Sequence, residues 1–459
     1  MKKLTAILIS LLMLLAVLPC GAEGEEPLSV ALSHESPLFD MGVTHAAAIT
    51  ASGDGYAWGY NYNGPIGNGV STGTCPTPYN WGGGARFVSV NSKTTLMIDT
   101  QDRLWIWGET WWGIGGEPMP GGSYVSFEPV QIASNVRMAS MGFNHVVFVK
   151  NDNTLWTYGQ NAHGQLGNGN TNNNYNPTQI MTNVAYAAAG NCLTAAVKTD
   201  GTLWAWGYNA SGQVGNGSTS DRTTPVQVLT GVYTVSTMGD HVMAIKTDGT
   251  LWAWGDNTYG QLGKGNTSVQ RTPVQVMTGA AQVSAGADHT GVLKTDGSLW
   301  FCGRNYMGPF GNGSTSGYSA ANPTFTRTQG SYVAVKCGNR LTAALREDGA
   351  LMVAGDNTYG QLGLGFTNNP DGTRYFATLT ANGLDLLSDG PGPGVLLGDV
   401  DANGAVEVPD ALMALRAAMG IIPTTAYMLE AGDVDANGAL EVPDALRILR
   451  YAMSLISSF

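Results

Sequence analysis

Cysteine is scarce in this chain of 459 residues, which contains five in total. Cys20 lies in the apolar N-terminal segment, and the other four are too scattered for a disulfide framework. Because a large core does not need covalent staples, so few cysteines are compatible with an oxidising compartment. Beyond Cys75, the cysteines lie in apolar, strand-like phrases, where we expect buried and unpaired thiols: Cys192, Cys302 and Cys337.

Basic side chains are also few, with 22 Lys and Arg against 34 Asp and Glu, a net charge of -12. Residues 398–459 hold nine acidic and three basic side chains, so half of the excess lies in this tail. A nucleic-acid-binding protein needs clustered Lys and Arg to neutralise phosphates. We therefore expect no nucleic-acid partner.

Long apolar runs are absent after the N-terminus, so we expect no transmembrane segment. The first residues read "MKK", then "LTAILISLLMLLAVLP", then "CGAEGEE". A basic start, a short apolar stretch and a small-residue site are typical of a secretory signal peptide, here residues 1–22. We expect a secreted protein that is extracellular or held at the cell surface. A lipoprotein anchored at Cys20 is the alternative, although the adjacent Pro19 fits it poorly.

Glycine and tryptophan, by contrast, are abundant, with 63 and 12 residues. They recur in phrases such as "AAVKTDGTLWAWGYNASGQVGNG" from 195 and "AIKTDGTLWAWGDNTYGQLGKG" from 244. The glycine that closes each Trp-containing phrase returns every 48 to 52 residues, at Gly59, Gly108, Gly159, Gly207, Gly255, Gly303 and Gly355. One supersecondary unit is thus repeated seven times.

Each unit is predicted to be β. Two short apolar strands flank an Asp-Gly turn, and a glycine-rich "GQLGNG" loop follows. Apolar residues occupy both faces of "LWAWG", so neighbouring units must cover both faces. We predict an all-β, seven-bladed β-propeller over residues 27–387, with "PLSVALSHESPLFDMG" pairing with "RYFATLTANGLDLL" to close the ring. Inter-blade packing is the expected role of nine tryptophans: Trp58, Trp105, Trp107, Trp156, Trp204, Trp206, Trp252, Trp254 and Trp300.

The phrases "VSAGADHTGVLKTDGSLWFCG" and "DNTYGQLGKG" resemble the repeat of the regulator of chromosome condensation family. This resemblance covers the whole predicted propeller and implies seven blades. The second unit departs from the repeat, with Thr94 in place of a histidine and "GETWWGIGG" as its loop. Exported bacterial propellers with such repeats bind proteins through the loops of one face, which is the closer analogy for an acidic, exported chain.

No catalytic site is predicted. Four histidines share one repeat position, but the other units carry Thr94, Leu193 and Leu341 there, so we expect structural histidines rather than a metal ring. Neither a nucleophile motif nor a base with its orienting partner is evident. The histidines are His45, His145, His241 and His289.

The loop between "WG" and "GQLG" varies while its flanks stay constant. Aromatic tips on one face would offer contact area with polar handles, although they could also simply cover the loop glycines. We expect a protein ligand first and a glycan second. The predicted ligand face comprises Tyr62, Trp111, Trp112, His163, Tyr259, Tyr306 and Tyr359.

After a Pro- and Gly-rich linker at 388–397, residues 398–459 contain "DVDANGAVEVPD" and "DVDANGALEVPD". Carboxylate, amide and carbonyl oxygens recur at positions 1, 3, 5, 7 and 12, as in EF-hand calcium loops, and glycine at position 6 permits the bend. We predict two calcium ions. The predicted ligands are Asp399, Asp401, Asn403, Ala405 and Asp410 in the first loop, and Asp433, Asp435, Asn437, Ala439 and Asp444 in the second.

A helix is expected after each loop, the second with Leu446, Leu449 and Met453 on its apolar stripe. This arrangement resembles a type I dockerin, a small α-helical calcium-binding domain. The resemblance implies docking onto a cohesin module of a scaffolding protein, as in cellulosome-like complexes. The partner contacts it implies are Val408, Pro409, Arg416, Val442, Pro443 and Arg450.

The sequence therefore predicts a secreted, non-catalytic binding protein anchored by a calcium-dependent dockerin. Two other functions stay open at this point. The propeller could be an enzyme acting on polysaccharide, which would require paired carboxylates facing a cleft, or a module that binds glycan.

Overall fold

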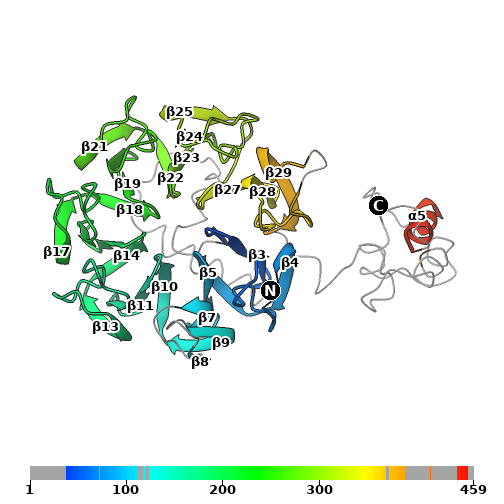
Figure 1. Cartoon of the computed structure of the whole chain (residues 1–459), viewed down its shortest axis with the longest axis horizontal. Coiled ribbons are helices and arrows are strands. Elements are labelled where there is room, and N and C mark those ends of the chain that lie inside the picture. The colour runs from blue at the N-terminus through cyan, green and yellow to red at the C-terminus, as the bar shows by residue number, and fades with distance from the viewer. Residues whose placement is uncertain are drawn as a thin grey trace, which may run out of the picture. The chain divides into compact units, whose positions relative to one another are not determined.

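The computed structural model describes residues 38–71, 73–110, 117–118, 124–368, 372–387, 414 and 442–452. The chain divides into two compact units, Met1–Leu386 and Leu387–Phe459, and each is described by itself. The first unit is a ring of seven antiparallel sheets (Figure 1). The predicted all-β, seven-bladed propeller is confirmed.

Every blade except the second has its strands in sequence order from the axis to the rim. The inner strands are β1 (Phe39–Met41), β5 (Ala85–Val90), β10 (Val136–Met141), β14 (Val184–Ala189), β18 (Val232–Thr237), β22 (Ala280–Ala285) and β26 (Ala334–Cys337). The second strands are β2 (His45–Ile49), β6 (Thr94–Asp99), β11 (His145–Lys150), β15 (Leu193–Lys198), β19 (His241–Lys246), β23 (His289–Lys294) and β27 (Leu341–Leu345).

The third strands carry the Trp-containing phrase: β3 (Gly55–Tyr60), β7 (Leu104–Thr110), β12 (Leu155–Gly159), β16 (Leu203–Gly207), β20 (Leu251–Gly255), β24 (Leu299–Gly303) and β28 (Ala350–Asp356). The outer strands are β4 (Thr74–Gly82), β9 (Tyr124–Ala133), β13 (Asn174–Met181), β17 (Arg222–Leu229), β21 (Gln270–Met277), β25 (Asn322–Thr328) and β29 (Tyr375–Asp385). The second blade adds the two-residue strand β8 (Glu117–Pro118) beyond β9.

The Asp-Gly turns form as expected. In the fourth blade, the Gly201 amide donates to the Lys198 carbonyl at 2.9 Å, and Gly201 has a φ of 77°. The turn sets the register of β15 on β16, in which Ala195 faces Ala205. Nearly every residue of these two strands is buried, because neighbouring blades cover both faces of the sheet.

Blades are joined by a repeated contact between a loop and an indole. The Trp206 Nε1 donates to the Gln165 carbonyl of the preceding blade at 3.0 Å. A Cβ on Gly167 would lie 2.6 Å from that nitrogen, so only glycine lets the loop approach. Trp58, Trp107 and Trp254 make the same type of bond to a loop carbonyl, which confirms their predicted packing role.

The expected strand exchange at closure is wrong for the described residues. β1 pairs with β2, and β29 pairs with β28, so the first and last blades are each built from one continuous stretch. The ring closes by loop contacts instead: Trp58 Nε1 donates to the Gln361 carbonyl at 2.9 Å, and the Asn339 amide donates to the Gly42 carbonyl at 3.2 Å.

The cysteines of the described residues are free. Cys302 and Cys337 are buried, as predicted, whereas Cys192 is only half-buried because it lies in a loop that ends just before β15.

In the second unit, helix α5 (Val442–Ala452) begins three residues before the expected helix, with Pro443 in its first turn. Ala445 and Ile448 are buried, and Leu446 is 48% exposed. The predicted stripe is therefore wrong at Leu446, which lies one residue away from the buried face. No helix among the described residues is long and apolar enough to span a membrane.

Candidate interaction face

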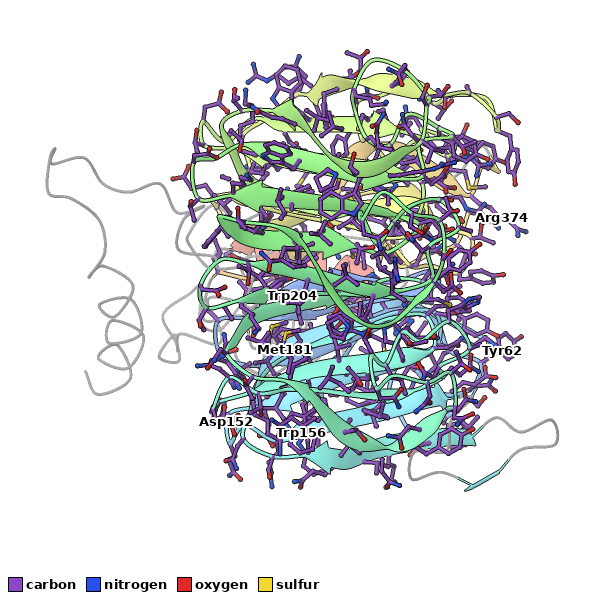
Figure 2. All side chains as sticks on the ribbon, turned by 90° about the vertical axis from the view of Figure 1, so that its left-hand side faces the viewer. Tyr62, Asp152, Trp156, Met181, Trp204 and Arg374 are labelled. Carbon is purple, nitrogen blue, oxygen red and sulfur yellow. The ribbon has the colours of Figure 1, made fainter. Side chains whose placement is uncertain are left out.

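The propeller has two chemically different faces. Figure 2 shows Tyr62 and Arg374 at one end of the blades and Asp152, Trp156 and Trp204 at the other. We call the first the tip face; it is formed by the loops that join inner to second strands and third to outer strands. The second, the turn face, carries the Asp-Gly turns.

A buried asparagine and a glutamine give the tip loops one constant frame. In the fifth blade, Asn257 Oδ1 accepts the Leu262 amide at 3.0 Å, and Asn257 Nδ2 donates to the Asn266 carbonyl at 2.7 Å. Gln261 Oε1 accepts the Tyr259 amide at 2.9 Å. The frame fixes where each loop tip stands, so residues at the tip can vary without disturbing the blade.

The histidines of the repeat are structural, as predicted. His145 Nε2 lies 2.9 Å from the Thr194 hydroxyl of the next blade, and that hydroxyl donates to the Gln165 carbonyl. His45, His241 and His289 make the same contact. Burial lowers the pKa of these histidines, to about 3 for His145 and His289 and about 4 for His45 and His241. They are therefore neutral at physiological pH.

The predicted tip residues that the structure describes fall into three separate groups. In the first, Tyr60 packs against Tyr62 and Tyr359 with ring centroids 5.2 and 5.3 Å apart. Tyr62 is 51% exposed and Tyr359 is 37% exposed, so this group presents aromatic surface at the junction of the last and first blades. Trp111 and Trp112 lie outside the described residues.

The second group surrounds His163, whose Nδ1 lies 2.8 Å from Asp221 Oδ2 and whose ring packs edge-on against Tyr208. Cys192 is nearby, but burial and the charges of Asp240 and Asp221 raise its pKa to about 11. A thiol with so high a pKa stays protonated, so this group does not provide a cysteine nucleophile.

The third group brings together Tyr259 and Tyr306 around a residue that the sequence analysis missed, Arg304. The guanidinium carbon of Arg304 lies 4.5 Å from the Tyr259 ring centroid, 5.6 Å from that of Tyr306 and 3.9 Å from that of Tyr318. Arg304 pairs with Asp288 at 3.0 Å. Because Arg304 follows Gly303 at a position where the units differ, comparing that position across the seven repeats would have found it.

A shallow depression lies beside the second blade on the same face. It has a volume of about 280 Å³, and Phe143, 45% exposed, lies on its edge. Lys93 and Glu109 pair across 2.6 Å in its wall. Phe143 was also missed from the sequence; it follows Gly142 in a loop that the repeat comparison did not single out.

The turn face is regular by comparison. In the fourth blade, the Thr202 hydroxyl donates to Asp200 Oδ1 at 2.6 Å. The same hydroxyl oxygen of Thr202 accepts a hydrogen bond from Trp204 Nε1 at 3.0 Å. Lys198 lies over the Trp204 ring at 5.3 Å. The same set recurs in the third, fifth and sixth blades, with serine replacing threonine in the sixth. These tryptophans are half-buried and capped by their own lysines, so the turn face looks alike over these four blades, whereas the first, second and seventh blades carry Tyr56, Trp105 and Met352 there.

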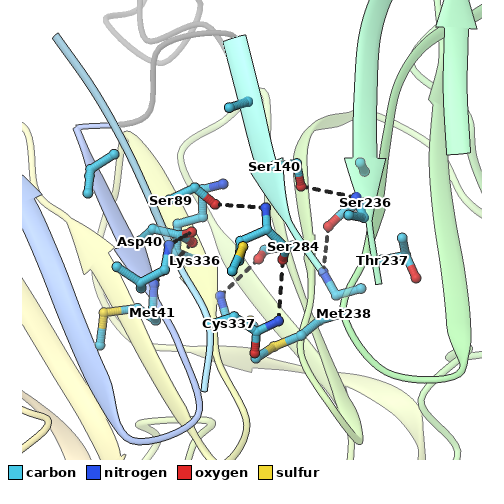
Figure 3. A pocket seen from close by; sticks show the side chains of 18 of the residues that line it. Asp40, Met41, Ser89, Ser140, Ser236, Thr237, Met238, Ser284, Lys336 and Cys337 are labelled. Carbon is cyan, nitrogen blue, oxygen red and sulfur yellow. Dashed lines mark hydrogen bonds between the residues drawn. The ribbon is translucent and has the colours of Figure 1, made fainter. Parts of the chain in front are cut away.

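The axial channel is narrow and polar. Figure 3 shows serine and aspartate side chains of the inner strands bonded to the backbone of the next blade. Ser140 Oγ accepts the Ala189 amide at 3.0 Å, and Asp40 Oδ2 accepts the Val90 amide at 2.9 Å. About 80 Å³ of the channel is open to water. These groups link blades and leave little room for a ligand.

The predicted tail sites fall almost entirely outside the described residues. This applies to the ligands Asp399, Asp401, Asn403, Ala405, Asp410, Asp433, Asp435, Asn437 and Ala439, and to the contacts Val408, Pro409 and Arg416. Asp444, Pro443 and Arg450 belong to α5, and Val442 is 51% exposed at its start. Both groups stay predictions. In the described part of the chain, no three His, Cys, Asp or Glu side chains are grouped so that they could hold a metal ion.

Several known proteins are similar to this chain. The ultraviolet-B receptor UVR8 of Arabidopsis thaliana is 29% identical over 135 residues, which is 28% of this chain and 30% of the receptor, so the match spans less than a third of that relative. Prp20p of Saccharomyces cerevisiae superposes with a TM-score of 0.60 at 18% identity, over 67% of this chain and 81% of its own. Human WBSCR16 superposes with a TM-score of 0.61 at 20% sequence identity, over 72% of this chain and 94% of its own.

The structures of Prp20p and WBSCR16 share the fold of this chain. A family model described as the RCC1-like domain matches residues 18–316, and one described as the regulator of chromosome condensation (RCC1) repeat matches residues 332–361. Because the first model spans more than half of the sequence, the protein belongs to the RCC1-like domain family.

Proposed function

We propose that the protein is a secreted, non-catalytic binding protein whose tip face recognises a protein partner. The observation that carries this proposal is the contrast between the two faces. On four of the seven blades the turn face repeats one set of capped tryptophans, whereas the tip face presents different aromatic and charged groups on loops with a constant frame. Tyr, Trp and Arg on preorganised loops are the residues that dominate protein recognition.

One of the similar structures supports a protein ligand. Prp20p has binding properties toward Gsp1p and histones, so a propeller of this fold binds proteins in that case. A glycan ligand is the second candidate, and the exposed Tyr62 favours it because aromatic rings also stack on sugars.

For the tail, we propose a calcium-dependent dockerin that anchors the chain to a cohesin module. The ligand order at Asp399, Asp401, Asn403, Ala405 and Asp410, repeated at Asp433, Asp435, Asn437, Ala439 and Asp444, supports two calcium ions. The start of α5 at Val442 is compatible with this, because the twelfth loop residue of an EF-hand leads into its exiting helix.

When bound, calcium would neutralise the repulsion among the loop carboxylates and so couple metal binding to folding of the tail. Val442 and Leu446 are 51% and 48% exposed and lie one turn apart on α5. An exposed apolar pair on a short helix is suited to a protein partner. The signal sequence at 1–22 supports export, and a scaffold would then hold the protein outside the cell.

Affinity capture with the full chain tests this proposal. Secreted and surface fractions are passed over the wild-type protein, a Trp111→Ala, Trp112→Ala, Tyr62→Ala variant and a turn-face control, Trp204→Phe. We expect a protein lost with the tip-face variant and kept with the control, and a second one lost when a chelator is added. Capture of the first protein by all three forms would contradict the tip-face assignment.

A further inference from the structure

The third tip-face group contains a buried cation that the fold does not require. At the position of Arg304, the other six blades carry Tyr60, Glu109, Gln160, Tyr208, Asp256 and Asp356. Arg304 is 8% exposed, and its Nη2 has no hydrogen-bond partner among the described residues. Burying a guanidinium and leaving one of its donors unpaired costs stability. The other blades show that several residue types fit this position. An arginine that lowers stability there therefore points to a function.

Arg304 holds one exposed ring in place. Its Nε donates to the Tyr318 carbonyl at 2.8 Å, and its guanidinium packs under the Tyr318 ring. The Tyr306 ring packs edge-on against Tyr318 with centroids 5.1 Å apart. Tyr318 is nevertheless 61% exposed, the most exposed large apolar side chain among the described residues. A large aromatic group that is both fixed and exposed loses little entropy on binding.

The loop that carries Arg340 lies against the loop that carries Asp288, because the Ala287 amide donates to the Gly338 carbonyl at 3.2 Å. Arg304, through hydrogen bonding and its charge, lowers the pKa of the Tyr318 phenol, and Arg340 of the next blade lowers it further, while Asp288 opposes them. Arg304 is already paired with Asp288. Arg340 makes no salt bridge with any described residue. Asp356 of the same blade contacts it through the backbone, because the Asp356 amide donates to the Arg340 carbonyl at 2.9 Å. Arg340 is thus a cation outside any salt bridge, in the loop next to the one that holds Asp288.

We propose that Tyr318 and Arg340 form a binding site of the tip face for a protein segment that carries a carboxylate beside an apolar group. The carboxylate accepts from the Tyr318 hydroxyl and the Arg340 guanidinium, and the apolar group packs on the Tyr318 ring. Charge-assisted bonds of this kind are stronger than neutral ones. A neutral sugar could stack on the ring without using Arg340, so the unpaired cation favours an acidic protein segment. This inference rests on the proposed function and names the chemistry of its partner.

A panel of random peptides displayed on phage, selected on the immobilised full chain, tests the inference. We expect selected peptides to share an Asp or Glu next to an aromatic or aliphatic residue. Their affinity should fall about tenfold or more for Tyr318→Ala and for Arg340→Met, as for residues that dominate an interface. Tyr318→Phe, which keeps the ring and removes the hydroxyl, should lose part of the affinity. Tyr79→Phe, an exposed tyrosine of the outer strand β4 and outside the tip loops, is the matched control and should lose none.

A double-mutant cycle identifies the charged contact. Replacing the peptide carboxylate by its amide should weaken binding to the wild type and have little further effect on Arg340→Met. Thermal denaturation of each variant shows whether the fold is kept. Peptides without acidic residues, or ones insensitive to both Tyr318→Ala and Arg340→Met, would overturn the inference.

The outcomes also separate this inference from the proposed function. If selected peptides lose affinity with Tyr62→Ala or Phe143→Ala instead, the tip face still binds proteins and only the site is wrong. If no peptide is selected, or if a glycan array shows binding that depends on Tyr318, the inference and the protein-binding function are both wrong.

Discussion

The indole nitrogen of Trp58 donates to the carbonyl of Gln361, 303 positions later in the chain, at 2.9 Å. The same bond joins Trp206 to Gln165 and Trp254 to Gln213 between consecutive blades. The last blade therefore holds the first as the third holds the fourth and the fourth holds the fifth. Closure needs no exchanged strand, because the loop glycines let these tip loops reach the tryptophan of the neighbouring blade.

Trp58→Phe should lower the free energy of unfolding by about 1–3 kcal/mol, because it leaves the Gln361 carbonyl buried and unpaired. Trp58→Ala should cost about 3–5 kcal/mol. Chemical denaturation measures both. Trp254→Phe, at an interface between consecutive blades, should cost about as much as Trp58→Phe. A much smaller loss for Trp58→Phe would mean that the ring is not closed in solution.

The buried histidines should make the propeller sensitive to acid. Their pKa values of about 3 to 4 lie below the value of 6.5 for an exposed histidine, so the unfolded chain binds more protons as the pH falls below 6.5. Stability should therefore be constant above that pH and fall below it, by roughly 2 kcal/mol per histidine between pH 7 and pH 5.

His145→Leu tests this through a residue that the fourth and seventh blades already use there, Leu193 and Leu341. The free energy lost between pH 7 and pH 5 should shrink by roughly 2 kcal/mol. His163→Gln, on the half-exposed tip, should leave most of the loss in place. An unchanged pH dependence in His145→Leu would show that this histidine is not buried and neutral.

Prolines on the outer strands should protect the rim from edge-to-edge pairing. Pro225 of β17 and Pro273 of β21 lie on the outermost strand of their blades. Pro225→Val with Pro273→Val should speed aggregation, followed by light scattering, without a matching loss of unfolding free energy. The control, Thr224→Val with Thr272→Val, adds apolar surface but keeps both prolines and should aggregate more slowly. Equal rates would assign the effect to apolarity alone.

Calcium should fold the tail without affecting the propeller. Titration calorimetry of the full chain should give two ions, and Asp399→Ala with Asp433→Ala should abolish their binding, because position 1 of each loop is a direct ligand. The helical signal in circular dichroism should rise with calcium in the wild type only. Asp200→Ala with Asp248→Ala, in propeller turns, should bind normally. Loss of binding in that control instead would place the ions elsewhere.

The repeat carried most of the fold in its sequence. Local chemistry sets the Asp-Gly turns, and the double-sided apolar pattern of "LWAWG" sets the buried third strands, so both could be predicted. The way the ring closes could not be predicted, because the bond between Trp58 and Gln361 depends on the combined rotation of seven blades around the axis. Leu446 was misplaced because α5 has apolar residues on more than one side: Ala445 and Ile448 form the buried face, and Leu446 lies one residue away from it.

The tip face was only partly predictable. Variation at Tyr62, Tyr259 and Tyr306 shows in the sequence once the repeats are aligned. Arg304 and Tyr318 come together only in space, because Tyr318 lies beyond the glycine-rich loop and folds back over the guanidinium. The sequence of a loop of unusual length does not show which side chain its aromatic residue packs against.

Hydrogen exchange of the full chain, with and without a captured protein partner, tests the central claim most directly. The claim is that one face of a closed propeller binds a protein. We predict slower exchange in the tip loops at 256–269 and 304–321 when the partner is bound, and unchanged exchange in the turns of the turn face at 151–153 and 247–249. Slower exchange in those turns, with the tip loops unaffected, would contradict it.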